Sequence, residues 1–179
     1  MLDVDALLRK YTDGNKDLYH ILCGHSEAVR DKALNIASSR GLDVDEDFVS
    51  EAAMLHDIGV GLCDAPAISC FGTQPYICHG VAGRMLLESE GLPRHALVCE
   101  RHTGSGISLA QIETQNLPLP RRDMLPLSLE EKLVCYADKF YSKSRDLRAE
   151  KPVDKIIAQM AAHGQDVLER FMEMHNMFS

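Results

Sequence analysis

Hydrophobic residues along this chain recur at spacings of three and four far more often than they alternate with polar residues. Leu18, Leu22, Val29 and Ala33, for example, form one such row. Residues three and four apart share one face of an α-helix, whereas strict alternation is typical of a β-strand. No run of β-branched residues lies between turn signals either. The pattern therefore predicts an all-α protein, a single-domain helical bundle spanning residues 1–179.

Helix caps and helix breakers give the bounds of the predicted helices. Asp and Ser side chains cap helix N-termini, whereas Gly and Pro commonly stand just beyond a helix end. The predicted helices run from about Lys16 to Gly41, from Asp45 to about Ile58, up to Gly91, from Pro93 onward, from Ser128 to about Ser144, between Pro152 and His163, and over 165–178. Ser128 and Glu131 have the spacing of a capping box. Residues 59–75 and 116–126 lack the periodicity and are predicted to be loops.

Six polar residues interrupt the inward rows of these helices. They are His25, His56, Asp57, His79, His102 and Asp138. A buried carboxylate without a partner costs several kcal/mol or gives up its charge, so something must compensate it. A single buried histidine is commonly explained by a hydrogen bond to a backbone carbonyl. Four imidazoles and two carboxylates converging from facing helices are instead what a pair of divalent cations requires.

Composition and charge narrow the classes of function. The 179 residues are 45% hydrophobic, enough for one domain with a sizeable core. A net charge of -8 disfavours binding to a nucleic-acid polymer or to an anionic membrane face. The acidic start "MLDVDALLRKYTDG" lacks the features of a secretory signal, and no segment has transmembrane length, so we expect a cytoplasmic protein. The six cysteines contain no CxxC pair and are expected to be free thiols, with Cys78 the candidate for a thiol near the site.

The order of the six polar residues resembles the HD-domain superfamily of metal-dependent phosphohydrolases. Its pattern is a histidine, a His-Asp doublet, and then His, His and Asp on successive helices. The motifs that carry the resemblance are "HDIG", "CHG", "ERHTG" and "YADKF", and the stretches "RHTGSGI" and "RRDMLPLSLEEKLVCYADKFYSKSRD" look like a small branch of predicted hydrolases. The resemblance covers the chain from about His25 to Asp146 and implies an all-α fold with a metal site. We therefore expect a metal-site core at about 16–146, followed by the C-terminal helices that the pattern predicts over 152–178. The resemblance does not fix the substrate.

The resemblance also implies a ligand set. It assigns His25, His56, Asp57 and Asp138 to one divalent ion, and Asp57, His79 and His102 to a second. Only a carboxylate can bridge here, because its two oxygens reach two ions about 3.5 to 4 Å apart whereas a neutral imidazole offers one lone pair. We therefore expect two divalent ions, which could be Fe, Mn, Zn, Ni, Co or Mg.

The implied reaction is cleavage of a phosphoester or phosphoanhydride of a small phosphorylated molecule, foremost a nucleotide, by a metal-bound hydroxide. Asp57 is catalytic in this scheme, and Lys139 and Arg145 are the first choices for contact with the phosphate. Arg101 and Arg84 are the second choices. The "TGSG" stretch at 103–106 either offers backbone N–H groups to a phosphate or ends a helix with turn glycines.

Two features leave alternatives open. Several HD hydrolases carry a lysine or an acid just after the doublet, whereas this chain has Val60 and Gly61, so that role must be supplied elsewhere. The same six ligands also suit a diiron oxygenase, and a pocket that binds without turnover would make the protein a noncatalytic nucleotide sensor. The oligomeric state is open.

The methionine-rich tail "RFMEMHNMF" is expected to pack in the core, because methionine fills gaps between side chains.

Overall fold

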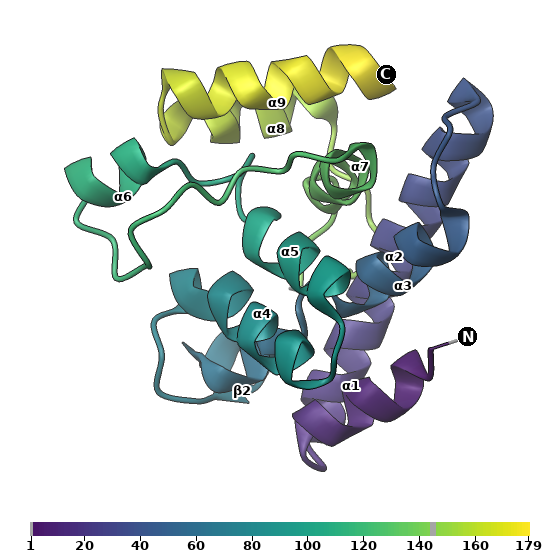
Figure 1. Ribbon diagram of the computed structural model, residues 1–179, viewed down its shortest axis with the longest axis vertical. Helices are drawn as coiled ribbons and strands as arrows, with labels where there is room; N and C mark the ends of the chain where they lie inside the picture. The colour runs from purple at the N-terminus through teal and green to yellow at the C-terminus, as the bar shows by residue number, and fades with distance from the viewer. Residues whose placement is uncertain (1, 144–145) are drawn as a thin grey trace.

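The computed structural model describes residues 2–143 and 146–179, and within these residues the protein is built almost entirely of α-helices (Figure 1). The helices are α1 (Val4–Thr12), α2 (Lys16–Arg40), α3 (Glu46–Leu55), α4 (His79–Ser89), α5 (Pro93–Arg101), α6 (Leu109–Thr114), α7 (Leu129–Asp138), α8 (Val153–Ala162) and α9 (Gln165–Phe178). The prediction of an all-α fold is confirmed. Helices α1 and α6 were not among the predicted elements.

Short elements connect α3 to α4, where the sequence predicted a loop. They are three 3₁₀ turns, η1 (Ile58–Leu62), η2 (Pro66–Ile68) and η3 (Tyr76–Cys78), and two strands, β1 (Asp64–Ala65) and β2 (Cys70–Phe71). The strands form an antiparallel hairpin in which Asp64 lies opposite Phe71. Two-residue strands are too short to give a visible alternation of apolar and polar positions, so the sequence pattern could not show them.

Side-chain caps explain where several helices begin. Asn15 accepts a hydrogen bond from the backbone N–H of Leu18, and Asp45 accepts one from Phe48. The N-terminal N–H groups of a helix have no partner within the helix, so each cap satisfies one of them. At the other end of α2, Gly41 has φ +60°, the left-handed conformation that glycine adopts without strain. The predicted bounds of α2 are therefore confirmed.

The capping box predicted at Ser128 forms only in half. Ser128 accepts a hydrogen bond from the N–H of Glu131, as predicted. The Glu131 side chain does not return to Ser128, because it accepts hydrogen bonds from Leu127 N–H and Arg101 instead. A complete capping box is found at Ser108, at the start of α6.

Two helices end earlier than predicted. Helix α3 ends at Leu55 rather than Ile58, and α7 ends at Asp138 rather than Ser144. After Asp138 the backbone tightens into i→i−3 hydrogen bonds, such as Tyr141 N–H to Asp138 C=O, and leaves the helix. Most of the polar residues singled out by the sequence therefore stand at helix ends rather than on helix faces.

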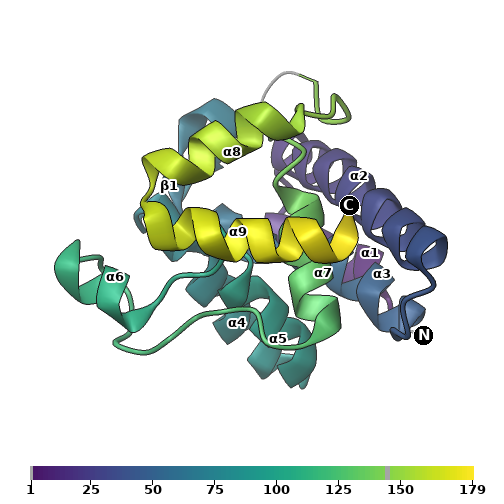
Figure 2. The same cartoon turned by 90° about the horizontal axis from the view of Figure 1, so that it is seen from above.

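The helices pack around two main apolar cores. One lies between α2, α3 and α7 and is covered by α8 and α9, which meet at one end and diverge across the top of the molecule (Figures 1 and 2). Phe171 and Met174 of α9 are buried there, as predicted for the methionine-rich tail, whereas Met177 is exposed. The second core lies between α1, α2, α4, α5 and the hairpin. The polar residues meet where these helices converge.

Candidate metal centre

The structure brings the six predicted residues together. His25 lies within α2, His56 and Asp57 directly follow α3, His79 begins α4, His102 follows α5, and Asp138 ends α7. Each is at most 8% exposed to solvent. Their potential ligand atoms form two groups, each with its members within 4.8 Å of one another, and Asp57 belongs to both. The convergence is as predicted, but the expectation that all six lie on the inward rows of helices is wrong for His56, Asp57 and His102, which follow the last residues of α3 and α5.

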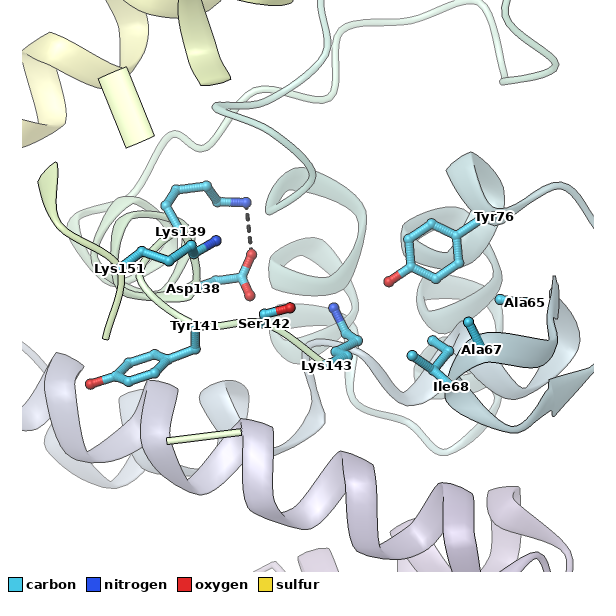
Figure 3. Close-up of a pocket in the computed structure, with 10 residues that line it drawn as sticks. All are labelled: Ala65, Ala67, Ile68, Tyr76, Asp138, Lys139, Tyr141, Ser142, Lys143 and Lys151. Atoms are coloured by element: carbon cyan, nitrogen blue, oxygen red, sulfur yellow. Dashed lines mark ion pairs between the residues drawn. The ribbon is translucent and has the colours of Figure 1, made fainter. Parts of the chain in front are cut away.

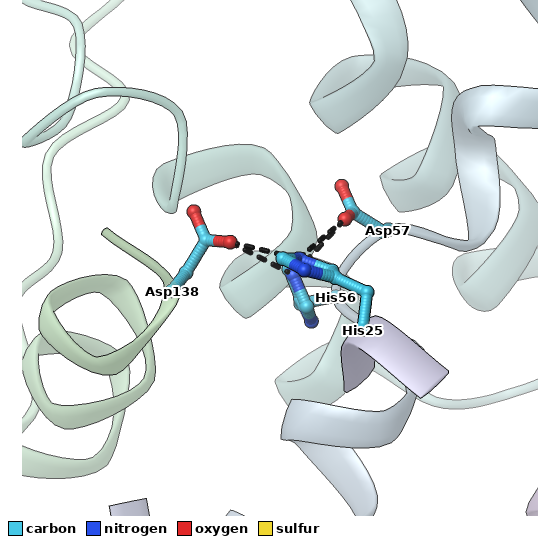
Figure 4. A group of neighbouring side chains, drawn as sticks. All are labelled: His25, His56, Asp57 and Asp138. Atoms are coloured by element: carbon cyan, nitrogen blue, oxygen red, sulfur yellow. Dashed lines mark hydrogen bonds and ion pairs between the residues drawn. The ribbon is translucent and has the colours of Figure 1, made fainter. Parts of the chain in front are cut away.

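The first group contains His25, His56, Asp57 and Asp138 (Figure 4). Nε2 of His25 lies 3.3 Å from Oδ2 of Asp57 and 3.0 Å from Oδ1 of Asp138. Nε2 of His56 lies 3.1 Å and 3.4 Å from the same two oxygens. Two imidazole nitrogens and two carboxylate oxygens thus face a common point.

The second group uses the other oxygen of the shared carboxylate. Oδ1 of Asp57 lies 3.3 Å from Nε2 of His102 and 3.6 Å from Nε2 of His79. The two Nε2 atoms are 3.0 Å apart. Because Oδ2 of Asp57 faces the first group and Oδ1 the second, this side chain has the geometry of a bridge between two cations.

Backbone carbonyls fix the orientation of three of the four imidazoles. Nδ1 of His56, His79 and His102 lies 2.6 to 2.7 Å from the carbonyl oxygen three residues earlier in the chain. A carbonyl oxygen only accepts, so Nδ1 carries a proton in each ring and Nε2 is presented to Asp57. This arrangement is typical of metal-binding histidines. His25 differs, because its Nδ1 is buried without a hydrogen-bond partner among the described residues.

Buried polar atoms without hydrogen bonds show that the cluster fits cations. Among the residues that the structure describes, Nε2 of His56 and both carboxylate oxygens of Asp57 are buried without a hydrogen bond of normal geometry, although ion-pair neighbours lie close to them. Leaving such atoms unsatisfied costs about 1 to 3 kcal/mol each, and more for charged groups. A divalent ion in each group would satisfy them, and nitrogen and oxygen donors suit a first-row divalent metal.

A lysine that sequence reasoning missed lies against the shared carboxylate. Nζ of Lys143 is 2.6 Å from Oδ2 of Asp57, and the Lys143 side chain is only 14% exposed. Burial alone would raise the pKa of Asp57, but Lys143 and His56 hold it well below its ordinary value. Lys143 lies five residues after Asp138, beyond the end of α7, where helical periodicity gives no direction. It places a cationic group beside the His56-Asp57 doublet, although the residues that follow the doublet in sequence, such as Val60 and Gly61, carry no charge.

The histidines differ in charge because their neighbours differ. Burial lowers the pKa of His56, but the carboxylates of Asp57 and Asp138 outweigh it and raise that pKa to about 9. Burial and the adjacent His102 lower the pKa of His79 to about 3. At neutral pH, His56 is therefore protonated in the metal-free protein, and His79 is neutral.

Lys139, predicted to contact phosphate, is at the site. Its Nζ lies 2.7 Å from Oδ2 of Asp138 and donates to the carbonyl oxygen of His102 at 3.0 Å. Burial would raise the pKa of Asp138, but Lys139 and the two neighbouring histidines lower it strongly. Lys139 and Lys143 thus each pair with one carboxylate of the cluster.

A cavity of about 400 Å³ opens beside the cluster (Figure 3). Its lining residues are Ala65, Ala67, Ile68, Tyr76, Asp138, Lys139, Tyr141, Ser142, Lys143 and Lys151. Tyr76 links the cavity to the second group, because its ring stacks on that of His79 with the ring centres 4.7 Å apart. The charged groups that line the cavity are three lysine ammonium groups and one carboxylate, that of Asp138. The cavity is therefore suited to an anionic ligand.

Other predicted residues lie elsewhere. Arg101 pairs with Glu131, and Arg84 pairs with Glu88 and with the buried Glu100, so neither arginine lines the cavity. These ion pairs join α4, α5 and the start of α7, so both arginines are engaged with carboxylates away from the cavity. Arg145 falls outside the described residues.

The "TGSG" stretch and the cysteines also have structural roles. Gly104 and Gly106 have φ +61° and +85°, and Arg170 of α9 donates to the carbonyl oxygens of Ser105 and Gly106. This stretch therefore ends α5 and holds α9, as the turn-glycine interpretation predicts. All six cysteines are free, and Cys78 donates to the carbonyl oxygen of Pro118 rather than lining the cavity.

A family comparison agrees with this geometry. The model of the HD domain matches residues 22–142, a range that contains all six clustered side chains. The chain belongs to the HD-domain family. As an HD domain with a buried His/Asp cluster, it carries the features expected of a divalent-metal site in a superfamily of metal-dependent hydrolases. Within the described residues, none of the helices combines the length and apolar character needed to cross a bilayer.

Three curated relatives resemble this HD domain. It is 31% identical over 154 residues to tRNA (cytidine(56)-2'-O)-methyltransferase of Picrophilus torridus, covering 86% of this chain and 40% of that protein. It is 28% identical over 159 residues to the methyltransferase of the same name from Thermoplasma volcanium, covering 88% and 42%. An uncharacterized protein of Methanocaldococcus jannaschii is 36% identical over 118 residues, covering 64% and 62%. The chain thus spans about two fifths of each methyltransferase. No solved structure matches it.

Proposed function

We propose that this HD domain is a metal-dependent phosphohydrolase acting on a small phosphorylated molecule, with a nucleotide as the first candidate. The observation that carries the proposal is the cavity beside the cluster, which Lys139, Lys143 and Lys151 line. A phosphate bound there would lie next to the carboxylates that hold the metals, with ammonium groups around its oxygens. Such positioned cations stabilise the charge that develops during phosphoryl transfer.

Each side chain of the cluster has a defined part in this proposal. His25, His56 and Asp138 would hold one ion, His79 and His102 the other, and Asp57 would bridge them. Two bound divalent ions supply Lewis-acid stabilisation and lower the pKa of a water molecule towards neutrality. The oxygen of water forms a bond to phosphorus, the bond from phosphorus to the leaving oxygen breaks, and a proton from the water passes to the leaving group. Lys139 and Lys143 would offset charge on the phosphoryl oxygens.

The relatives suggest RNA as a second source of substrate. Two of them are named tRNA methyltransferases, and each matches more than four fifths of this chain. We do not transfer methylation itself, because the chain spans only about two fifths of those proteins and its cluster has the donors of a metal site. The net charge of -8 argues against an extended tRNA surface. A terminal or cyclic phosphate of an RNA end remains a candidate that reaches the cavity without such a surface.

Phosphate release tests the proposal. The protein, purified without chelators and analysed for metals, is incubated with nucleoside mono-, di- and triphosphates, 2',3'-cyclic nucleotides and tRNA carrying a terminal phosphate. We expect metal-dependent release of phosphate or pyrophosphate from at least one of these, and none from protein treated with a chelator. Phosphate release from the tRNA alone would indicate that the substrate is the phosphate of an RNA end.

Two other results would overturn the proposal. Oxygen consumption by an anaerobically iron-loaded sample, without phosphate release from any substrate, would assign the cluster to a diiron oxygenase. Tight nucleotide binding by the metal-loaded protein, without product after long incubation, would assign it to a sensor. The lysine-lined cavity favours hydrolysis over oxygenation, because the activation of oxygen does not require cationic side chains that bind an anion.

A further inference from the structure

We propose that Lys151 forms a second anion subsite in the cavity, so that the preferred substrate carries another phosphate besides the one that reacts. This inference rests on the proposed function and deepens it. It names Lys151 as a residue that determines specificity, and compounds with two or more linked phosphates, such as a nucleoside diphosphate, as the substrate class.

Charge pairing sets Lys151 apart from the other two lysines of the cavity. Lys139 pairs with Asp138, and Lys143 pairs with Asp57. Lys151 has no carboxylate within ion-pair distance among the described residues. The two carboxylates at this end of the cluster are thus already matched by two ammonium groups. The charge of Lys151 is in excess and is available to a ligand.

The backbone holds Lys151 in place. Its N–H donates to the carbonyl oxygen of Phe140 at 2.8 Å, and Pro152 follows it immediately before α8 begins. Proline restricts its own φ angle and the conformation of the residue before it. The ammonium group therefore extends from a fixed point of the chain. A ligand would lose less entropy on binding to such a group than to a lysine on a mobile loop.

The surroundings of Lys151 favour an anion. Burial lowers the pKa of Lys151, and Lys139 and Lys143 lower it further, against the attraction of Asp138. Three ammonium groups gathered in one partly buried cavity repel one another, and an anion placed among them would relieve that repulsion. One phosphate over the metal cluster can engage Lys139 and Lys143. Lys151 then remains for a second phosphate.

The cavity also has opposite ends of different chemistry (Figure 3). Lys139 and Lys151 lie at one end, Tyr76 and Ile68 lie at the other, and Lys143 lies between them. The organic part of a ligand fits the end with the aromatic and apolar side chains, and its phosphates fit the lysine end. A volume of about 400 Å³ is within the usual range for small-molecule sites.

Binding of two phosphonates tests the subsite without any turnover. The probes are methylphosphonate, with one anionic group, and methylenediphosphonate, whose P–C–P link cannot be hydrolysed. Both are titrated by calorimetry into the full chain loaded with Mn²⁺. We expect the diphosphonate to bind the wild-type protein more tightly, and Lys151→Met to weaken its binding about tenfold or more while changing that of methylphosphonate less than about twofold.

Two further variants separate the subsite from general effects of charge. Lys151→Arg keeps a cation at this position and should keep the preference for the diphosphonate. Lys155→Met removes an exposed lysine four residues away and should bind both probes like the wild type. The inference is overturned if the wild type binds both phosphonates equally, or if Lys151→Met weakens both to the same extent.

Kinetics connect the subsite to the reaction. Lys151→Met should lower kcat/KM for a nucleoside diphosphate about tenfold and leave that for the monophosphate within about twofold. Equal losses for the two substrates would overturn the inference while leaving the phosphohydrolase proposal intact. If the wild type released no phosphate from any compound, the proposed function would fail, and the phosphonate titrations would still decide whether the second subsite exists.

Discussion

Nζ of Lys143 lies 2.6 Å from Oδ2 of Asp57, so the segment after α7 supplies a cation to the doublet that follows α3. Asp57 is fully buried and shared by both groups of ligands. A buried carboxylate keeps its charge only when neighbouring cations or donors compensate it. Lys143 therefore stabilises the charged form of the residue on which the whole cluster depends, and it also faces the cavity.

Replacing Lys143 by methionine should destabilise the metal-free protein. Removal of one partner of a buried ion pair leaves the other charge uncompensated, and we expect a loss of about 3 kcal/mol in the free energy of unfolding. Chemical denaturation in the presence of a chelator measures this loss. Added Mn²⁺ should restore much of the stability, because a bound cation compensates Asp57 in place of the ammonium group. Lys155→Met is the control, and an equal loss in that variant would refute the role of the ion pair.

Asp57→Asn should remove both metal ions. The substitution keeps the shape of the side chain but leaves one neutral acceptor oxygen in place of two charged ones, so one group loses its Asp57 oxygen and both groups lose the negative charge. Elemental analysis of the purified variant should find metal reduced to background. Circular dichroism checks that the variant is folded.

His79→Gln provides the matched comparison. His79 belongs to only one of the two groups, so this variant should lose the second ion and keep much of the first. Full metal content in Asp57→Asn would refute the bridging role. Loss of both ions in His79→Gln would show that the two positions are not independent.

Metal binding should release a proton at neutral pH. The pKa of His56 in the metal-free protein is about 9, so the ring is protonated below that pH, whereas a metal requires the lone pair of Nε2. About one proton should leave His56 per protein at pH 7, and the number should fall towards zero as the pH rises past 9. The apparent affinity for metal should increase with pH over the same range. Calorimetric titrations in buffers of different ionisation enthalpy measure the proton release.

His95 offers a control for this measurement. It lies 3.2 Å from Glu51, in neither group of the cluster, and its pKa is lowered by burial. His95→Gln should therefore release the same number of protons on metal binding as the wild type. Metal binding without proton release at pH 7 would contradict the raised pKa of His56.

The sequence predicted the metal cluster better than the cavity, for a physical reason. His25, His79 and Asp138 interrupt apolar rows, and a polar residue in such a row must find partners inside the fold. Lys143, Lys151 and Tyr76 lie in irregular segments or a 3₁₀ turn, where periodicity gives no direction for a side chain. Lysine is also common at the surface, so nothing in its type marks a buried one. Of the lysines that line the cavity, Lys143 and Lys151 could be found only from the structure.

The early end of α7 shows the same limit. The periodicity predicts that the helix continues past Asp138, and it would assign each following residue to a helix face. The helix in fact ends at Asp138, so these assignments do not apply. The resemblance to HD hydrolases identified Lys139, which directly follows a motif residue. It gave no reason to choose Lys143, whose position depends on the backbone leaving the helix after Asp138.

A glycine contact between η1 and α4 should control the second group of ligands. A Cβ atom at Gly59 would collide with the backbone of α4, at the nitrogen of Gly83 and the carbonyl oxygen of His79. Backbone atoms cannot move aside as a flexible side chain can, so Gly59→Ala should push η1 away from the first turn of α4. We expect a loss of about 3 kcal/mol in the free energy of unfolding, at the upper end of the cost of overpacking.

The neighbouring Gly61 allows this effect to be isolated. A Cβ atom at Gly61 would lie 3.3 Å from the carbonyl oxygen of Tyr11, a contact that needs only a small adjustment. Gly61→Ala should therefore be clearly more stable than Gly59→Ala. Displacement of α4 also moves His79, so Gly59→Ala should bind less of the second metal ion while Gly61→Ala keeps both, as elemental analysis can measure. Equal stability and equal metal content in the two variants would show that the contact between η1 and α4 does not position His79.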